Sequence, residues 1–279
     1  MTLETVSFEG HDCVRLEDGD VAVVVTISTG PRILGLLVEG VNLFAVLPDA
    51  FLDGPDGERF RFVGGHRPWV APEVPSITYR SDDRTCAVTE VEEGVIVEAP
   101  PDGAQLAKSI AVRRDSPGWI VDHVVRNVSQ RSMTIAPWAI TQLRTGGEAL
   151  LPIAPREEGP QADRSLVLWP YTDLADPRIG FGHDEVRIDA ARSGPPLKLG
   201  AAPSDGRVGY RLGSHRFEKR IDVNPDATYP DRGAAVQVYL CHEFCELETL
   251  GPLEAVPPGG AVTHREHWLV ATVGWAATP

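Results

Sequence analysis

The segment from Gly64 to Glu73 gathers four chemically different side chains within a few residues of a glycine pair. They are an imidazole, a guanidinium, an indole and a carboxylate, supplied by His66, Arg67, Trp69 and Glu73. Sugar hydroxyls need charged or bidentate hydrogen-bond partners, and the apolar face of a pyranose packs on an aromatic plane. The segment therefore predicts a sugar-sized binding site. The alternative is a buried loop in which Arg67 pairs with Glu73 while Trp69 packs in the core.

A second segment carries two glutamates at alternate positions. If Phe244 to Leu250 forms a strand, Glu246 and Glu248 share one face, with their carboxylates about 7 Å apart. Paired carboxylates beside apolar side chains raise one pKa, which suits a general base. The alternative is an exposed strand face with ordinary acids, because carboxylates are rarely buried.

A third segment, Ser132 to Leu143, places Trp138 and Gln142 on one strand face. An indole beside an amide again suits a sugar, although core packing of the tryptophan is the alternative. His123 lies inside an apolar strand and is expected to be a structural histidine with its hydrogen bonds satisfied. His264 lies in a polar context and is given no special role.

Charge and composition exclude several classes of function. Forty acidic and 26 basic residues give a net charge of -14 without a Lys/Arg-rich run, which argues against nucleic acid as a partner. No apolar window of about 18 residues and no signal peptide are present, so we expect a cytoplasmic protein with no membrane partner. Phosphate-loop, nucleophile-elbow, zinc-protease and dinucleotide fingerprints are missing, and we expect no cofactor.

The four cysteines, Cys13, Cys86, Cys241 and Cys245, are too few and too irregularly spaced for a disulfide scaffold, so we expect reduced thiols. Cys241 and Cys245 flank His242, which raises the question of a metal ion. Four residues of continuous strand would separate the two sulfurs by about 13 Å, too far for one ion. We therefore expect no metal site.

The distribution of glycine, proline and β-branched residues predicts an all-β protein. Twenty-four prolines and 27 glycines separate short runs rich in Val, Ile, Leu and Thr. The clearest predicted strands are Val21 to Ile27, Val95 to Glu98, Trp119 to Val128, Met133 to Leu143, Val236 to Leu240 and Val262 to Val273. Helical periodicity is limited to one-turn segments such as Pro48 to Leu52.

Regularly spaced turns favour a large twisted antiparallel β-sandwich over βαβ units. A chain of 279 residues can form one such sandwich, and we expect residues 1–279 to be a single domain. Two stretches rich in Pro, Gly and Asp, Pro152 to Pro170 and Asp173 to Gly182, are expected to be loops. Loops of this length usually carry function or cover a site.

Taken in order, these segments resemble the aldose 1-epimerase (galactose mutarotase) superfamily, and more closely one of its bacterial branches. The resemblance spans nearly the whole chain. It rests on Gly30-Pro31-Arg32-Ile33-Leu34 followed by Val41-Asn42-Leu43-Phe44, the Gly64 to Trp69 loop, Asn127 before the central strand, Leu247-Glu248-Thr249, and Pro258-Gly259-Gly260 with a closing strand through Trp268. The resemblance implies the galactose mutarotase-like supersandwich.

The resemblance also implies a reaction. In such mutarotases a glutamate takes the proton of the anomeric hydroxyl while a histidine protonates the ring oxygen, so that the ring opens and recloses as the other anomer. The motif match makes Glu248 the base, with Glu246 as its rival. The family's His-x-Tyr-Phe-Asn pattern is replaced here by Ala136 to Gln142, so His66 is the candidate acid.

The same resemblance implies a small-molecule carbohydrate as the ligand. Its binding candidates are the hydroxyl partners and aromatic platforms Arg32, Arg67, Glu73, Gln142, Trp69 and Trp138. Two functions stay open: an epimerase-like isomerase acting on a sugar or sugar derivative, and a non-catalytic carbohydrate-binding or regulatory protein that keeps the cleft. A related lyase or another ring-opening reaction is a third, because a fold does not determine its chemistry.

Overall fold

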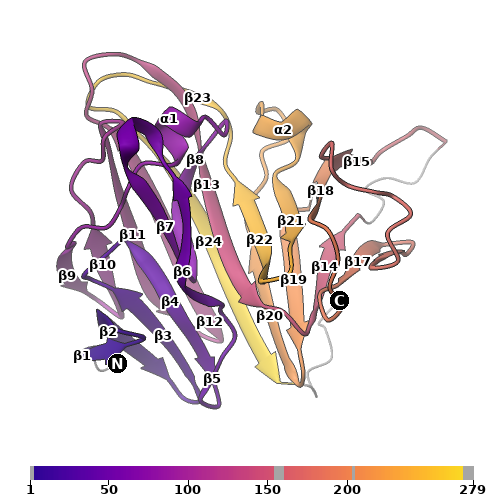
Figure 1. The fold of residues 1–279 in the computed structure, drawn as a ribbon, viewed down its shortest axis with the longest axis horizontal. Helices are drawn as coiled ribbons and strands as arrows, with labels where there is room; N and C mark the ends of the chain where they lie inside the picture. Colours follow the sequence, from indigo (N-terminus) through magenta and orange to yellow (C-terminus); the bar gives the residue numbers. More distant parts are fainter. Residues whose placement is uncertain (1–2, 154–159, 203–204, 273–279) are drawn as a thin grey trace.

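The computed structural model describes residues 3–153, 160–202 and 205–272, and antiparallel β-strands dominate it (Figure 1). In these ranges one sheet has twelve strands. Its path runs β1 (Leu3–Phe8), β2 (His11–Asp18), β3 (Val21–Thr26), β4 (Arg32–Val38), β8 (His66–Ala71), β13 (Met133–Arg144), β22 (Phe244–Leu250), β21 (Val236–Leu240), β18 (Leu197–Ala202) and β15 (Ser165–Leu168), while β5 (Val41–Asn42) pairs with β4 and β23 (Glu254–Val256) with β13.

The second large sheet has ten strands within the same ranges. They follow the order β16 (Ile179–Phe181), β17 (Glu185–Asp189), β14 (Glu148–Pro152), β19 (Arg207–Leu212), β20 (His215–Arg220), β24 (Ala261–Thr272), β12 (Gly118–Asn127), β11 (Leu106–Asp115), β10 (Gly94–Glu98) and β9 (Ala87–Val91). A separate hairpin is formed by β6 (Val46–Asp53) and β7 (Arg59–Gly64), and the short helical turns are η1 (Pro55–Gly57), α1 (Pro75–Thr78) and α2 (Pro230–Gly233).

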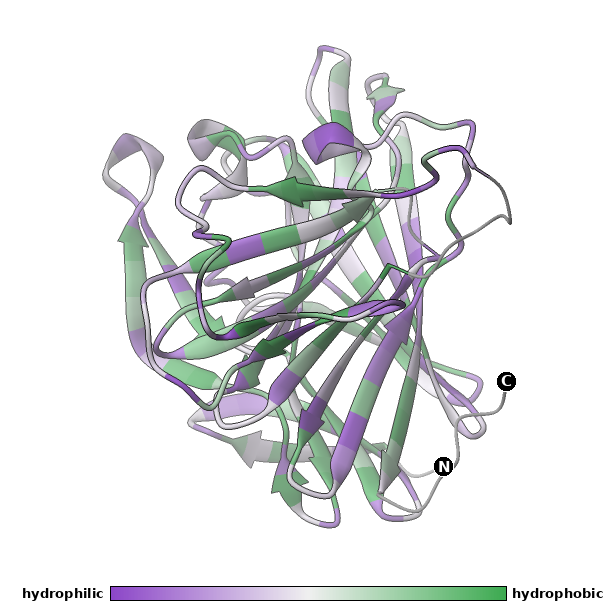
Figure 2. Cartoon of the chain, turned by 90° about the vertical axis from the view of Figure 1, so that its right-hand side faces the viewer, coloured by the Kyte–Doolittle hydropathy of each residue, from purple (hydrophilic) through white to green (hydrophobic). Residues whose placement is uncertain are grey.

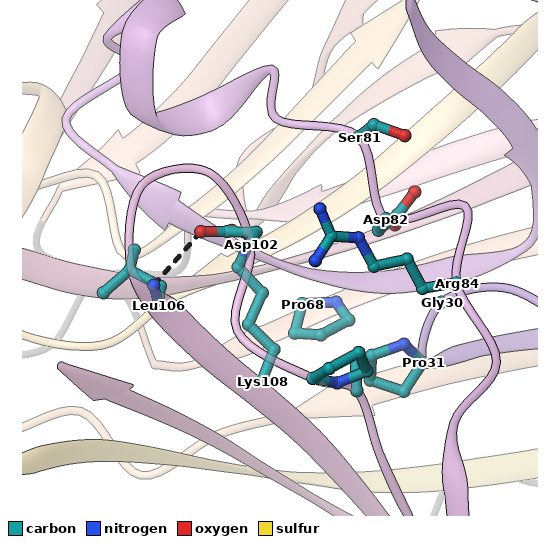
Figure 3. A pocket seen from close by; sticks show the side chains of 11 residues that line it. Gly30, Pro31, Pro68, Ser81, Asp82, Arg84, Asp102, Leu106 and Lys108 are labelled. Carbon is teal, nitrogen blue, oxygen red and sulfur yellow. Dashed lines mark hydrogen bonds and ion pairs between the residues drawn. The ribbon is translucent and has the colours of Figure 1, made fainter. Parts of the chain in front are cut away.

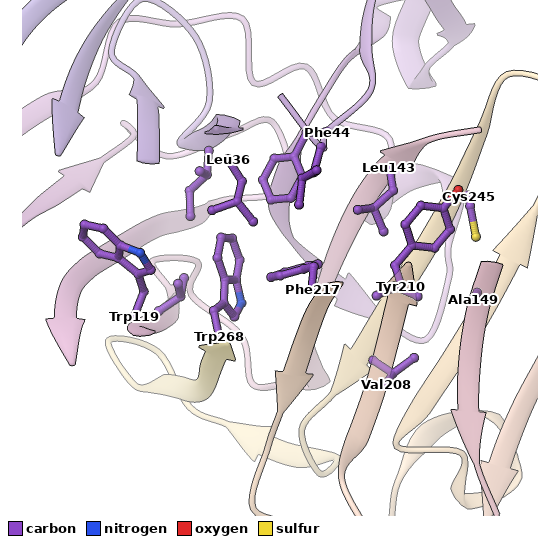
Figure 4. Packing of buried hydrophobic residues seen from close by; sticks show 14 of the residues in the cluster. Leu36, Phe44, Trp119, Leu143, Ala149, Val208, Tyr210, Phe217, Cys245 and Trp268 are labelled. Atoms are coloured by element: carbon purple, nitrogen blue, oxygen red, sulfur yellow. The ribbon is translucent and has the colours of Figure 1, made fainter. Parts of the chain in front are cut away.

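An aromatic cluster lies at the centre of the core between the two sheets (Figure 4). The ring of Trp268 on β24 meets Phe217 on β20 and Phe44 edge-on, with centroids 5.2 Å and 5.7 Å apart. Edge-to-face contacts of this kind add to the free energy gained by burying the rings. The two sheets are therefore the layers of one sandwich, as the turn spacing predicts.

Long strands of the ten-stranded sheet, such as β11, β12 and β24, alternate between buried and accessible residues, and alternating hydropathy is visible along strands in Figure 2. In the twelve-stranded sheet β8, β18 and β22 are buried throughout, and in the central strand β13 every residue from Ile135 to Leu143 is buried. One face of β13 points into the sandwich core, so a second group of side chains must cover its other face. That covered outer face is where the predicted site residues gather.

Two adjacent glycines set the direction of the side chains on β8. Gly64 and Gly65 have φ angles of +98° and +70°, and a Cβ atom on either would lie 2.1–2.2 Å from a backbone carbonyl oxygen, that of Ala45 or Ile33. Only glycine tolerates both constraints. The chain then enters β8 with His66 facing the core and Arg67 facing outward.

The structure corrects three local predictions. The segment Pro48 to Leu52 is part of strand β6 rather than a helical turn, because Phe51 and Leu52 pair with β7. The predicted loops contain β15 and β16, each of which extends the edge of a large sheet. Residues 154–159 of the first loop, and the end of the last predicted strand at Val273, lie outside the described residues.

The clearest predicted strands are confirmed within the described residues. The four cysteines are free and buried. Among the described residues, none of the helices has the length and apolar character needed to span a membrane.

Candidate functional site

A pocket of about 540 Å³ lies on the outer face of the twelve-stranded sheet. Five side chains from four strands form its floor: Arg67 and Trp69 of β8, Trp138 of β13, Glu246 of β22 and Lys198 of β18. All five point away from the sandwich core because they alternate with core-facing neighbours along their strands. The structure therefore brings together four of the predicted site residues in this floor and adds Lys198.

Aromatic side chains dominate the walls of this pocket. Trp69 contacts Trp138 with ring centroids 5.4 Å apart, and the two indoles make a continuous apolar floor. Phe60 is fully buried and packs on Trp69 with ring centroids 5.2 Å apart, but it does not line the pocket. The β6–β7 hairpin contributes Phe62 to the wall. The segment that follows β15 in the chain contributes the half-exposed Tyr171. Such faces suit the apolar side of a sugar ring.

Glu246 is the carboxylate that lines the pocket. Its Oε1 atom accepts a hydrogen bond of 3.0 Å from Nε2 of Gln142 and lies 3.6 Å from Nη2 of Arg67. Its Oε2 atom has no hydrogen-bond partner within the described part of the chain. Burial, and then the negative charge of Glu248, raise the pKa of Glu246 to about 7, although Arg67 opposes this change. Near neutral pH this group can therefore both accept and donate a proton.

Glu248 lies on the same strand face but is fully buried, and it is not part of the pocket wall. Its Oε2 atom accepts hydrogen bonds from Nζ of Lys198 at 2.7 Å and from Nε1 of Trp138 at 2.8 Å. Lys198 in turn lies between the rings of Trp138 and Trp169, 4.9 Å and 4.6 Å from their centroids. Glu248 is thus the counter-ion of a pocket-lining lysine.

Sequence reasoning missed Lys198, although a signal was present. Lys198 is the one charged residue in the apolar strand Leu197–Ala202. A lone charge in a buried strand requires a buried partner of opposite sign, and the two glutamates of β22 were the available candidates.

Glu73 and Tyr79 line the pocket on the side of α1, and the Tyr79 hydroxyl donates a short hydrogen bond to Oε1 of Glu73. Burial, and then this hydrogen bond, raise the pKa of Tyr79. The structure does not show the alternative ion pair between Arg67 and Glu73, because the carboxylate that pairs with Arg67 is that of Glu246.

His66 does not face the pocket, so the structure does not bring it to Glu246 or Glu248. It points from the inner face of β8 into the sandwich, where Nδ1 lies 2.8 Å from Oγ1 of Thr141 and Nε2 lies 2.6 Å from Nε2 of His123. The cause is the two-residue period of the strand, which sends His66 and Arg67 to opposite faces. The role of acid opposite Glu248 therefore has no geometric support.

His66 belongs instead to a buried polar cluster inside the sandwich. Nζ of Lys219 lies 2.7 Å from Oε1 of Glu266, whose Oε2 atom accepts the indole N–H of Trp268 at 2.7 Å. His264, given no role above, is also buried here, and its Nε2 atom lies 2.7 Å from Oγ1 of Thr249. Burial lowers the pKa of His264 to about 3 and also lowers the pKa values of His66 and His123.

This cluster brings possible metal ligands together, since the ligand atoms of His66, His123 and Glu266 lie within 4.8 Å of one another. Lys219 already neutralises Glu266, so a divalent cation would leave two net positive charges in a fully buried site. The residues do not fit a metal ion for that reason. A second group of possible metal ligands consists of Cys241, His242 and Glu243. It lies at the turn between β21 and β22, in a segment that was predicted to be continuous strand.

Arg32, a predicted binding residue, is fully buried outside the pocket. Its guanidinium donates to the backbone oxygens of Phe62 and Arg61, at 2.8 Å and 3.1 Å, and forms an ion pair of 2.7 Å with Asp82. Arg32 therefore ties β4 to the hairpin and to the segment before β9. It does not contact the pocket.

A second hollow lies between Pro31, Pro68 and Lys108 (Figure 3). Its volume is only about 10 Å³, about one water molecule. Asp102 closes it by accepting the backbone N–H of Leu106 at 3.1 Å and by pairing with Lys108. This hollow is too small for an organic ligand.

No protein-family model and no curated protein matches the sequence. Solved structures do resemble it over nearly its whole length. The Slr1438 protein from Synechocystis sp. PCC 6803 superposes with a TM-score of 0.58 at 12% identity, covering 98% of this chain and 100% of that one. A candidate aldose 1-epimerase from Escherichia coli K12 gives 0.57 at 12% identity, covering 93% and 98%. A galactose mutarotase-like protein from Lactobacillus casei ATCC 334 gives 0.57 at 10% identity, covering 93% and 100%.

These similarities define the fold. The chain is an all-β protein with large antiparallel sheets, and it has the galactose mutarotase-like fold. The fold class predicted from the sequence is confirmed. At these identities the likeness carries no reaction or ligand with it, so the function must be argued from the pocket.

Proposed function

We propose that this protein binds a sugar in the pocket over β8, β13, β22 and β18 and isomerises it at the anomeric carbon by acid/base catalysis. The observation that carries the proposal is Glu246, a carboxylate with one free oxygen on the floor of an aromatic pocket. A carboxyl whose pKa is about 7 suits proton exchange with a hydroxyl near neutral pH. The candidate epimerase of similar fold supports the same class of reaction.

In the proposed reaction Glu246 takes the proton from the anomeric hydroxyl. The electron pair of that O–H bond forms the aldehyde C=O bond, and the bond between the anomeric carbon and the ring oxygen breaks. Lys198 faces the same pocket and supplies a proton to the ring oxygen as negative charge develops there. Rotation about the adjacent C–C bond and reversal of these steps give the other anomer.

Glu246 replaces Glu248 as the proposed base because of accessibility. Glu246 retains 8% of its exposed surface and lines the pocket, whereas Glu248 has none and is held by Lys198 and Trp138. A general base must come within hydrogen-bond distance of the proton that it removes. Glu248 then acts on Lys198 rather than on the sugar.

The test is anomer-exchange NMR on ligands first identified by thermal shift among aldoses, uronates and sugar phosphates. Glu246→Gln should lower the exchange rate at least about a hundredfold, a typical general-base contribution, while a bound sugar still raises the melting temperature. The control Glu254→Gln changes an exposed glutamate of β23 and should leave the rate unchanged. Full exchange activity in Glu246→Gln would refute the assignment of the base.

The second candidate function is a carbohydrate-binding protein without catalysis. No histidine lies among the described residues that line the pocket, whereas the resemblance implies a histidine as the acid. Sugar-dependent stabilisation of the wild-type protein without any acceleration of anomer exchange would establish this second function.

A further inference from the structure

The guanidinium of Arg67 has no hydrogen-bond acceptor among the described residues. Arg67 is 1% exposed and lines the pocket, and its Nε, Nη1 and Nη2 atoms are all buried without a partner. A buried charge without hydrogen bonds is costly, and native proteins rarely leave one. The missing acceptor is therefore expected to come from a bound molecule.

The surroundings of Arg67 hold its plane but do not satisfy its donors. Its Cζ atom lies 4.1 Å from the ring centroid of Trp69 and 5.4 Å from that of Phe62. Aromatic faces stabilise a cation but accept no forked pair of N–H bonds. The nearest carboxylate oxygen, Oε1 of Glu246, is 3.6 Å away and is already bonded to Gln142.

Arg32 provides an internal comparison. It is as deeply buried as Arg67, yet its guanidinium donates to two backbone oxygens and to both carboxylate oxygens of Asp82. Both terminal nitrogens of Arg32 thus have acceptors and, within the described part of the chain, only its Nε atom has none, so the fold can supply acceptors to a buried arginine where no ligand is involved. Arg67 lacks such acceptors among the described residues, and it is the one of these two arginines that lines the pocket. This difference indicates that a ligand supplies the acceptor.

A carboxylate is the acceptor that fits best. Its two oxygens match the fork of a guanidinium, which the single contact of 3.6 Å with Oε1 of Glu246 does not fill. The other pocket cation, Lys198, is already neutralised by Glu248. A phosphate dianion would leave more charge uncompensated, because among the described lining residues only Arg67 and Lys198 are basic.

We propose that the ligand of this pocket is an acidic sugar, of the aldohexuronate class, whose carboxylate pairs with the guanidinium of Arg67. This inference rests on the proposed function, since it assumes that the pocket binds a sugar. It assigns the pocket a substrate class and gives Arg67 the role of specificity determinant, while Glu246 carries out the proton transfer.

The first experiment compares matched ligands on the wild-type protein by isothermal titration calorimetry. The pairs are galacturonate with galactose and glucuronate with glucose, and the corresponding uronamides are uncharged analogues of similar shape. The acid should bind about ten- to a hundredfold more tightly than the neutral sugar, which is the usual range for a charge-assisted pair. The uronamide should behave like the neutral sugar. Equal binding of acid and neutral sugar, or a preference for hexose 6-phosphates, would overturn the inference.

The second experiment changes Arg67. Arg67→Gln and Arg67→Lys should both reduce the acid preference, Arg67→Gln to about one and Arg67→Lys less fully, because a lysine keeps the charge but not the fork. Binding of the neutral sugar should change much less. Arg144→Gln removes an exposed arginine from the far end of β13 and should retain the full preference. An unchanged preference in a folded Arg67→Gln protein would refute the role of Arg67.

The two proposals fail in different ways. If uronates bind with the Arg67-dependent preference but show no accelerated anomer exchange, the acidic-sugar inference stands and the isomerase proposal falls. If neutral aldoses bind as well as uronates and exchange depends on Glu246, the isomerase proposal stands and the acidic-sugar inference falls. If no sugar binds, both are wrong.

Discussion

The Nζ atom of Lys198 lies 2.7 Å from Oε2 of Glu248, and both groups are almost completely buried. The same oxygen accepts the indole N–H of Trp138, so one carboxylate joins a lysine of β18 to the central strand β13. The Oε1 atom of Glu248 has no partner among the described residues. Glu248 therefore depends on Lys198 to compensate its charge. Glu246, which lines the pocket, is the glutamate of β22 that a ligand can contact.

The first prediction concerns this ion pair. Lys198→Met removes the ammonium and leaves the carboxylate of Glu248 buried without compensation, which should lower the free energy of unfolding by about 3–5 kcal/mol. Urea denaturation measures the change. Adding Glu248→Gln to Lys198→Met should restore much of the loss, because the uncompensated charge is then gone. Equal stability of the single and double variants would show that the pair is not coupled.

The second prediction concerns the pH dependence of anomer exchange. As a base, Glu246 must be ionised, so kcat/KM should rise with pH and reach half of its maximum near pH 7, where the pKa of Glu246 lies. Glu248→Gln removes a negative neighbour that raises this pKa, and the midpoint should move to lower pH. NMR exchange rates between pH 5.5 and 8.5 provide the measurement. An identical midpoint in both proteins would show that the pH dependence of kcat/KM does not come from the titration of Glu246.

The strand pattern predicts the fold class and places Glu246 and Glu248 on one face, because a period of two needs only local sequence. It does not show which of the two is covered, since that depends on Lys198 and Trp138 from distant parts of the chain. The same period separates His66 from Arg67. The hypothesis that both serve one cleft treats their segment as a loop, whereas the glycine pair leads directly into a strand.

The third prediction concerns stability at acidic pH. Burial lowers the folded-state pKa values of His66, His123 and His264 below 6.5, so the unfolded chain binds more protons below that pH. The stabilisation is complete above about pH 6.5 and is lost as the pH falls toward the folded-state values. Each histidine contributes up to about 1.4 kcal/mol per pH unit.

Urea denaturation at pH 7, 6 and 5 tests this dependence. His264→Gln should have a shallower dependence of unfolding free energy on pH than the wild type, because one buried titrating group is gone. His242→Gln, at an exposed position, should keep the wild-type slope. Comparing slopes cancels the effect of the overall charge. Identical slopes in all three proteins would mean that the buried histidines do not account for the loss of stability in acid.

The fourth prediction concerns the glycine pair that directs β8. Gly65 and Gly40 both have positive φ angles, +70° and +80°, so alanine is strained at either position. At Gly40 nothing lies within 4 Å of the added methyl group, whereas at Gly65 it would lie 2.2 Å from the carbonyl oxygen of Ile33. Gly40→Ala should therefore cost about 1–2 kcal/mol, the cost of the backbone conformation alone. Gly65→Ala should cost at least about 2 kcal/mol more, because β8 must move away from β4. Since β8 carries Arg67 and Trp69 into the pocket, Gly65→Ala should also weaken ligand binding in calorimetry, and Gly40→Ala should not. Equal losses of stability with unchanged binding would show that the close approach of β4 does not position the site.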